Sequence, residues 1–326
     1  MSENTFKQLA DTMRLGSSER IVKIWSLLCN EEEASILLAM PGPVESIALK
    51  TGMGVGAVEE SLSRLFMRGV AFEENGADGI VWSRPKGLIH FHDSTVIWKE
   101  APETLKVLWK EFMDEEYPMF VSMVKKAGLG PFMRVVPVNK KIESGTEILP
   151  YEDAAEIVKK AKKIAVVECR CRMTRGKCDA NREVCLQLNE FAEYMVKRGS
   201  GRIITNDEAI AILDDAERAG LIHAAENRSS GTRVLCNCCT CCCLMLGPMI
   251  KYGAFANPSR YVAVVSESEC SGCGMCESRC RTQAIKVEAD FAVVDDKKCI
   301  GCGLCSTACP TEAISLKEIR SKQFIP

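Results

Sequence analysis

The chain has 326 residues, of which 47% are hydrophobic, and a formal net charge of −2. This length predicts two or three globular domains, and the near-neutral charge excludes a general electrostatic affinity for nucleic acid. Charged residues interrupt the N-terminal segment, and no uncharged apolar run is long enough to span a membrane, so we expect a cytoplasmic protein without a secretory signal. In a reducing compartment, its nineteen cysteines indicate metal binding or catalysis rather than disulfides.

Residues 1–95 predict helices followed by a hairpin. Helical periodicity covers residues 17–28 and 31–40, where the lone Cys29 is expected to be a core residue. A helix, a turn and a longer helix follow, with these apolar positions facing inward: Val44, Ile47, Ala48, Val58, Leu62, Leu65 and Phe66. The strands "GVAFEE" and "GIVWSR", joined by "NGADG", predict the hairpin. This order resembles the winged helix-turn-helix of DNA-binding regulators.

The charge of this winged-helix-like module opposes DNA binding. Residues 1–100 hold fourteen acidic side chains and ten lysines or arginines. Glu59 and Glu60 lie near the start of the helix that would enter the DNA groove, where phosphates and bases would be contacted. We therefore expect a docking or structural module rather than a nucleic-acid partner, although a redox-sensing regulator stays open as an alternative.

Residues 96–150 predict a helical linker or scaffold. An amphipathic helical stretch is interrupted near Pro118, and "RVVPVN" predicts a short strand. His90 and His92, just before this region, alternate in "IHFHD" and are expected to share one face of a strand. Two histidines do not complete a metal site, so we expect a structural role for them.

Residues 151–260 predict an α/β module rich in cysteine. The segment "PYEDAAEIVKKAKKIAVVECRCR" predicts a helix and then a strand, in which Cys169 and Cys171 share a face because side chains alternate in a strand. In "TRVLCNCC", Cys236 and Cys238 share a face for the same reason. If the two strands pair or converge, these four thiolates meet and form a candidate site for an extra iron–sulfur cluster.

The other cysteines of this module are weaker candidates. Cys178 and Cys185 are seven residues apart and would lie on one side of a helix. The octet "CNCCTCCC" adds Cys239, Cys241, Cys242 and Cys243. Neighbouring cysteines point in different directions in both helix and strand, so all six cysteines of the octet cannot bind one cubane. An iron–sulfur cluster, zinc and metal-free thiols all stay open for this module.

Basic residues accompany these cysteines. Arg170 and Arg172 lie within the "CRCR" motif, and Arg175, Lys177 and Arg182 follow. Cations beside a cluster stabilise an added electron, and they also attract an anionic substrate or an acidic partner. We therefore expect Arg170 and Arg172 to lie beside a bound cofactor. A second predicted helix, residues 206–219, begins with a capping box of Thr205 and Glu208.

Residues 261–326 contain an internal repeat. "ECSGCGMCESRCRTQAI" at 269–285 and "KCIGCGLCSTACPTEAI" at 298–314 repeat with a period of 29 residues and share Cys-x2-Cys-x2-Cys-x3-Cys. A tight loop with this spacing directs three thiolates at one cubane, and its glycines let backbone amides approach the sulfurs. Two complete copies make zinc or chance a poor explanation.

The repeat resembles the bacterial dicluster ferredoxin, over residues 261–318. That resemblance implies two 4Fe-4S clusters and two ligand sets: Cys270, Cys273, Cys276 and Cys309 for the first cluster, and Cys299, Cys302, Cys305 and Cys280 for the second. Pro310 follows the last cysteine as the family expects, but Arg281 replaces the other proline. From about residue 150 onward, "ECRCR" and "CNCCTCCC" also resemble predicted ferredoxin-like proteins of anaerobes.

The sequence thus predicts an α+β multidomain protein with a winged helix, an α/β cysteine-rich module and a dicluster ferredoxin domain. Its expected function is to relay single electrons to or from a partner oxidoreductase. A reductase that acts on a small molecule at the middle module is a further alternative. No flavin, nicotinamide or phosphate-binding fingerprint is present, and no catalytic residue is assigned.

Overall fold

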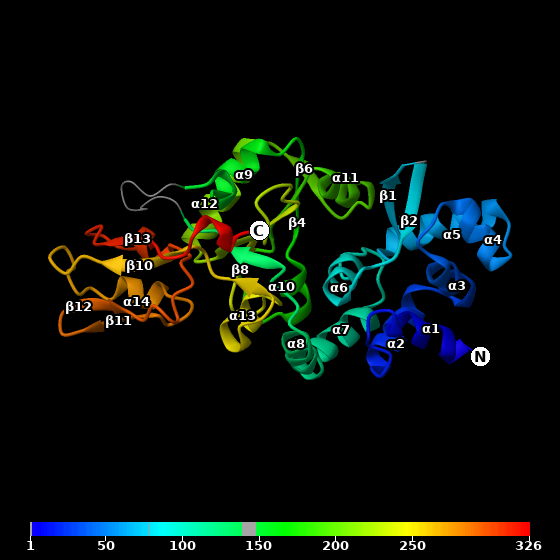
Figure 1. Ribbon diagram of the computed structural model, residues 1–326, viewed down its shortest axis with the longest axis horizontal. Helices are drawn as coiled ribbons and strands as arrows, with labels where there is room; N and C mark the ends of the chain where they lie inside the picture. The colour runs from blue at the N-terminus through cyan, green and yellow to red at the C-terminus, as the bar shows by residue number, and fades with distance from the viewer. Residues whose placement is uncertain (1, 78, 139–147) are drawn as a thin grey trace. The chain divides into compact units, whose positions relative to one another are not determined.

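The computed structural model describes residues 2–77, 79–138 and 148–326 (Figure 1). Its contacts divide these residues into two compact units. The first unit extends to Pro118 and includes Met173–Arg175, and the second comprises Met119–Arg172 and Gly176–Pro326. Among the described residues, no helix is both long enough and apolar enough to cross a membrane.

The first unit consists of helices and one hairpin. Its helices are α1 (Ser2–Asp11), α2 (Glu19–Leu28), α3 (Glu31–Ala39), α4 (Val44–Thr51), α5 (Val55–Arg68), α6 (Leu88–Thr95) and α7 (Glu103–Glu115). Strands β1 (Phe72–Gly76) and β2 (Gly79–Ser83) pair antiparallel, with Phe72 opposite Ser83. The order of helices and hairpin agrees with the sequence, but the winged-helix resemblance itself stays a prediction. Asp78, in the predicted turn, lies outside the described residues.

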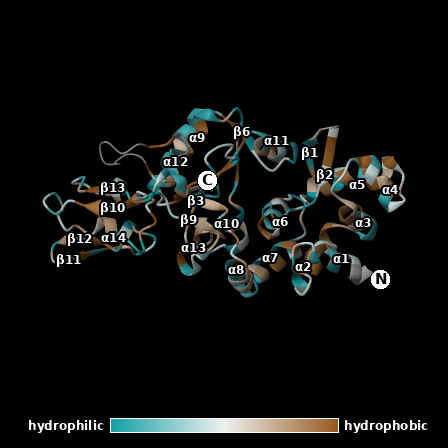
Figure 2. Cartoon of the chain, viewed as in Figure 1, coloured by the Kyte–Doolittle hydropathy of each residue, from teal (hydrophilic) through white to brown (hydrophobic). Residues whose placement is uncertain are grey.

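Local sequence explains how these helices begin and which faces they bury. The Ser18 hydroxyl accepts from Ile21 N at 3.2 Å at the start of α2, and Asn30 with Glu33 forms a capping box on α3. On α5, Val58, Leu62 and Leu65 are fully buried. Figure 2 shows hydrophilic and hydrophobic residues on the same helices, as expected for elements that cover a core with one face.

The structure corrects one prediction in this unit. His90 and His92 lie on α6 rather than on a strand. His92 is fully buried and its Nδ1 is 2.8 Å from Asp93 Oδ1. The predicted interruption near Pro118 is present, because α7 ends at Glu115 and a separate helix follows.

The second unit is built on a seven-stranded sheet. Its strands are β3 (Met133–Val135), β4 (Ile164–Glu168), β5 (Glu183–Leu188), β6 (Arg202–Ile204), β7 (Ile222–Glu226), β8 (Val234–Cys238) and β9 (Ala256–Asn257), in the order β6-β4-β5-β8-β7-β3-β9. All neighbours pair antiparallel except β3 and β9. The predicted strand "RVVPVN" is shorter than expected, and its last residue, Asn139, lies outside the described residues.

Helices accompany this sheet. They are α8 (Tyr117–Lys126), a 3-10 turn (Pro150–Glu152), α9 (Ala154–Lys160), α10 (Arg170–Arg175), α11 (Glu190–Lys197), α12 (Asn206–Arg218) and α13 (Leu246–Tyr252). The predicted capping box of Thr205 and Glu208 is present on α12. Apolar residues of α9 and α12 pack with β4, β5 and β8 in one core, which includes Val158, Leu213 and Leu235.

The C-terminal repeat forms two small antiparallel sheets and two short helices. Strand β10 (Tyr261–Val265) pairs with β13 (Ile314–Glu318), and β11 (Ile285–Glu288) pairs with β12 (Phe291–Val294). Helices α14 (Met275–Arg279) and α15 (Leu304–Thr307) occupy corresponding positions in the two copies, and a last 3-10 turn covers Lys322–Phe324. The repeated sequence is therefore a repeated structure.

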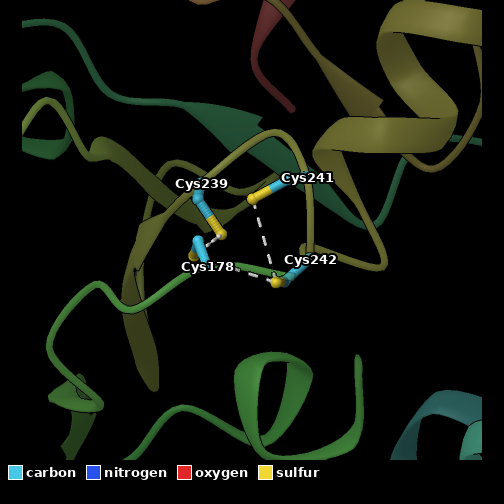
Figure 3. A group of neighbouring side chains, drawn as sticks. All are labelled: Cys178, Cys239, Cys241 and Cys242. Carbon is cyan, nitrogen blue, oxygen red and sulfur yellow. Dashed lines mark hydrogen bonds between the residues drawn. The ribbon is translucent and has the colours of Figure 1, made fainter. Parts of the chain in front are cut away.

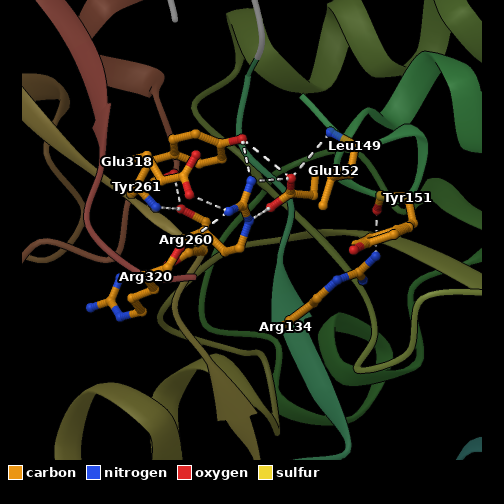
Figure 4. A network of polar contacts seen from close by, with 10 residues as sticks. Arg134, Leu149, Tyr151, Glu152, Arg260, Tyr261, Glu318 and Arg320 are labelled. Carbon is orange, nitrogen blue, oxygen red and sulfur yellow. Dashed lines mark hydrogen bonds and ion pairs between the residues drawn. The ribbon is translucent and has the colours of Figure 1, made fainter. Parts of the chain in front are cut away.

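A buried ion pair attaches this repeat to the rest of the second unit (Figure 4). Arg260 Nε donates to Glu152 Oε1 at 2.6 Å and Nη2 donates to Oε2 at 2.9 Å. Neither side chain is more than 2% exposed. Arg260 Nη1 also donates to Glu318 Oε1 at 2.6 Å. Because a buried charge without its partner is strongly unfavourable, the pair fixes β10 against the turn before α9.

Candidate metal centres

The first quartet of the C-terminal repeat surrounds a cavity. Cys270, Cys273, Cys276 and Cys309 all line it, together with Gly272 and Gly274 and with apolar residues of β11, β12 and β13. The backbone N–H of Ala292 donates to Cys270 Sγ at 3.4 Å. Four thiols converging on one space, with a backbone amide aimed at a sulfur, match the donor set that a 4Fe-4S cluster requires.

The second quartet is more deeply buried. Cys280, Cys299 and Cys302 all interact electrostatically with Cys305, so the four sulfurs share one site. Burial raises the pKa of Cys302 to about 12. The backbone N–H of Ala284 donates to Cys280 Sγ at 3.2 Å, and that of Ala263 donates to Cys299 Sγ at 3.5 Å. A buried thiol resists ionisation unless a cation compensates its charge, as the irons of a cluster do.

Six cysteines of the middle module form a closed ring of side chains. Each side chain interacts with two others closely enough to shift their pKa, in the order Cys169, Cys171, Cys243, Cys238, Cys236, Cys185 and back to Cys169. We call this set the six-cysteine ring. It brings together the two Cys-x-Cys pairs of the sequence, and Cys185 and Cys243 fill the two gaps between the pairs.

The thiols of the ring influence one another. Each shifts the pKa of its two neighbours, so a thiolate on the ring would be stabilised by the thiols on either side of it. Six soft donors held together in a buried site are suited to iron–sulfur chemistry.

Strand pairing explains how the ring assembles, and it corrects two predictions. The strand does not continue through Cys171: β4 ends at Glu168, and Cys169 is the residue before α10. Cys185 is not on a helix with Cys178, because it lies in β5, opposite Val167 of β4. Since β5 also pairs with β8, Cys185 lies between the two Cys-x-Cys pairs. Cys236 and Cys238 do lie on a strand, as predicted.

The remaining four cysteines form a second group, which we call the tetrad (Figure 3). It consists of Cys178, Cys239, Cys241 and Cys242, whose sulfurs all lie within 4.8 Å of one another. Cys178 lies in the loop after α10, and the other three lie in or just before the turn that follows β8. The octet therefore divides between two sites: Cys238 and Cys239 belong to different groups, and so do Cys242 and Cys243. This division agrees with the expected divergence of neighbouring side chains.

The two arginines of the "CRCR" motif occupy different positions. Arg172 is 1% exposed and donates from Nη1 to Asn181 O and from Nη2 to Asn237 O, both at 2.7 Å. Its guanidinium also interacts electrostatically with Cys169 and Cys239. It therefore lies beside both the ring and the tetrad. Arg170 instead donates to Met195 Sδ at 3.4 Å.

Sequence reasoning missed two buried polar residues beside the ring. His223 Nδ1 is 2.5 Å from Asn237 Oδ1, and Asn237 Nδ2 donates to Val184 O at 2.6 Å. Both side chains are at most 1% exposed. The available signal was the position of Asn237 between two cysteines of one strand, which places its side chain on the opposite face.

Comparison with known proteins identifies the C-terminal repeat. A family model described as a 4Fe-4S dicluster domain matches residues 263–316. No curated protein and no solved structure matches the chain. The match covers both copies of the cysteine motif, and the cavity and the buried quartet lie within it. Residues 263–316 therefore form a 4Fe-4S dicluster domain, which implies two 4Fe-4S clusters.

Proposed function

We propose that the protein relays single electrons between a partner oxidoreductase and its own middle module, through the two clusters of the dicluster domain. The first cluster would be held by the quartet of Cys270, Cys273, Cys276 and Cys309, and the second by the quartet of Cys280, Cys299, Cys302 and Cys305. The observation that carries the proposal is shared packing. Cys238 and Cys243 of the ring lie in the same apolar cluster as Ile300 and Leu304 of the dicluster domain, and Cys236 and Cys302 pack against it.

The solvent exposure of the two quartets suggests the order in which electrons would pass through them. Cys273 of the first quartet is exposed and Cys270 is partly exposed, so a partner protein can approach this quartet. In the second quartet, no cysteine is fully exposed in this way, and Cys305 is buried. Since the second quartet shares packing with the ring, electrons would pass from the partner to the first quartet, then to the second, and then to the ring.

A further iron–sulfur cluster in the six-cysteine ring completes the proposal. Its ligands would be Cys169, Cys171, Cys236 and Cys238, while Cys185 and Cys243 complete the ring between the two pairs. When bound, the cluster would accept or release one electron at a time. Arg172, close to Cys169, stabilises negative charge there. The fully buried Leu246 lies in the same apolar cluster as Cys238 and Cys243 of the ring.

Anaerobic iron and sulfide analysis tests the extra cluster. Two cubanes account for about eight irons per chain, and one more would give about twelve, with equal sulfide. Cys169→Ser combined with Cys236→Ser should remove about four irons and four sulfides, while Cys29→Ala, outside the module, should remove none. About eight irons and sulfides in the unaltered protein would exclude an extra cubane.

Electron relay itself needs a separate measurement. When the protein is mixed with a reduced electron-donor protein, the ring cluster should be reduced only if both dicluster quartets are intact. Cys302→Ser should therefore block electron transfer to the ring cluster while the ring cluster stays bound. Equal reduction rates with and without the second quartet would contradict the relay.

One observation favours a second candidate function, a reductase for a small molecule. An open depression of about 280 Å³ lies among Thr240, Gly247, Ile250, Arg281, Thr282 and Gln283. It adjoins both the octet turn and the residues after Cys280, so a bound molecule would lie between two cysteine sites. A ligand-dependent change in the cluster absorbance, lost in Thr240→Trp, would support this function.

A further inference from the structure

We propose that the tetrad of Cys178, Cys239, Cys241 and Cys242 binds a single metal ion in a tetrahedral four-thiolate site, separate from every iron–sulfur cluster. The inference goes beyond the proposed electron relay and does not depend on a cluster in the ring. The ion would be zinc or iron, the two metals that favour tetrahedral coordination by four sulfurs.

The sulfur separations carry the first step. Cys178 Sγ lies 3.7 Å from Cys239 Sγ and 3.9 Å from Cys242 Sγ, and Cys241 Sγ lies 3.8 Å from Cys242 Sγ (Figure 3). Four sulfurs at about 2.3 Å from one central ion are about 3.8 Å apart from one another. The tetrad thus has the dimensions of a site for one ion.

A cubane requires a wider arrangement. It binds each thiolate to a different iron, so its ligand sulfurs lie farther apart than the edge of a single-ion tetrahedron. Among the described residues, the tetrad is the one group of three or more potential ligands whose atoms all lie within 4.8 Å of one another. In the described residues, neither the quartets of the dicluster domain nor any three cysteines of the ring are packed as closely. The tetrad therefore differs from the proposed cluster sites of the same protein.

Hydrogen-bond donors converge on the tetrad. The backbone N–H of Lys177 donates to Cys242 Sγ at 3.3 Å. The backbone N–H groups of Ala180 and Cys242 favour the ionised forms of Cys178 and Cys239 respectively and so act to lower the pKa of each thiol, whereas burial acts to raise it. Donors of this kind stabilise sulfurs that carry negative charge, as metal-bound thiolates do.

The buried charge of Arg172 requires a negative partner. Its side chain is 1% exposed, the two carbonyl groups to which it donates are neutral, and its guanidinium interacts electrostatically with Cys239. A buried cation is strongly unfavourable without a compensating anion. A four-thiolate site with one divalent ion carries two net negative charges, so it supplies this compensation. On binding, each thiol that is still protonated releases its proton to solvent and its sulfur bonds the ion.

The unaltered, anaerobically purified protein gives the first test. Iron, zinc and acid-labile sulfide are measured per chain. Since each cubane contains equal iron and sulfide, we expect about one further metal ion, either zinc or iron in excess of sulfide. X-ray absorption at the zinc edge, where zinc is found, should show four sulfurs at about 2.3 Å. Equal iron and sulfide with no zinc would overturn the proposal.

Serine variants give the second test. Cys241 is exposed, so Cys241→Ser changes no buried packing. Cys178→Ser removes the one ligand that comes from the loop after α10. Both should lose the single ion and keep all acid-labile sulfide. Thr240→Ala, in the same turn between Cys239 and Cys241, is the matched control and should keep the ion. Loss of iron together with sulfide in Cys241→Ser would instead assign the tetrad to a cluster, and an unchanged metal content would show that the tetrad binds none.

Discussion

Gly301 shows how closely the loop of the second quartet packs against the start of β10. Its φ is +64°, and a Cβ at this position would lie 2.2 Å from Ser259 Oγ and from Tyr261 O. Gly274, in the first copy, has a φ of +74° but has no atom within 4 Å of such a Cβ. A side chain at Gly274 would therefore cause only backbone strain, whereas a side chain at Gly301 would also clash with neighbouring atoms.

Gly301→Ala should lower the iron content of the second quartet, because the chain between Cys299 and Cys302 must move to admit the methyl group. Gly274→Ala should cost only the left-handed conformation, about 1–2 kcal/mol of the free energy of unfolding, and keep both clusters. Iron and sulfide per chain, with urea unfolding, measure both effects. Equal iron contents in the two variants would contradict the steric explanation.

Arg172 is the residue that connects the ring with the tetrad. Arg172→Met should reduce the metal content of both sites and lower the free energy of unfolding by about 3–5 kcal/mol, because a buried charge partner is removed. Arg172→Lys keeps the charge and should restore part of the metal content. Arg182→Met, at an exposed position nearby, is the control.

The reduction potential distinguishes an electrostatic role for Arg172 from a purely structural one. In Arg172→Met molecules that keep a ring cluster, the potential should be lower than in the unaltered protein, because the cation stabilises the added electron. Arg172→Lys should return the potential toward its original value. An unchanged reduction potential in Arg172→Met would show that the arginine has only a structural role.

At the scale of elements, Arg281 explains a departure from the ferredoxin pattern. It stands where the second copy has Pro310, and its Nε donates to Gly220 O at 3.2 Å while Nη2 donates to Ala219 O at 3.4 Å. Nearby, Arg279 donates to Glu217 O. The carbonyl groups at the end of α12 thus accept hydrogen bonds from two arginines of the dicluster domain. A proline at position 281 could not donate such bonds.

Arg281→Met should loosen this contact without removing a ligand. We expect faster hydrogen exchange at the end of α12, a loss of about 1–3 kcal/mol for the charged hydrogen bonds, and unchanged iron content. Arg218→Met, on the same helix but exposed and paired with Asp215, should leave exchange at Gly220 unaltered. Loss of iron without faster exchange would show that Arg281 acts on the cluster instead.

Elements with strong local signals could be predicted from the sequence, and the sites could be predicted only in part. The capping box of α12 and the strand that carries Cys236 and Cys238 are both local patterns, and both are present. The repeat with its glycines was equally clear. The position of Cys185 was not, because a spacing of seven residues from Cys178 also suits a helix, and only the pairing of β5 between β4 and β8 places it in the ring.

The octet shows the same limit at the level of single side chains. The divergence of neighbouring cysteines predicted that six could not share one cubane, and the octet does divide between two groups. Which cysteine joins which group depends on the turn that follows β8 and on the loop that brings Cys178 to it. Neither conformation follows from spacing alone.

At the scale of the whole molecule, the two units have different sources of stability. The first unit has an aromatic core in which Trp25 stacks on Phe91 at 4.2 Å between ring centroids, and Trp109 donates from Nε1 to Thr95 Oγ1 at 3.1 Å. Eighteen of the nineteen cysteines lie in the second unit, and several of them take part in its buried clusters. We therefore expect metal binding and folding to be coupled in the second unit.

Metal removal should consequently destabilise the second unit and leave the first unit folded. Treatment with a strong chelator under anaerobic, denaturant-free conditions should speed hydrogen exchange in β4, β5 and β8 and in the dicluster domain, because buried thiolates that lose their metal must be protonated or exposed. Exchange in α2, α5 and α7 should stay slow, since their core contains no metal ligand. Hydrogen exchange with peptide resolution measures both units in one sample. Parallel loss of protection in both units would show that the first unit depends on the second for its folding, and unchanged protection in both would show that the cysteine sites contribute little to stability.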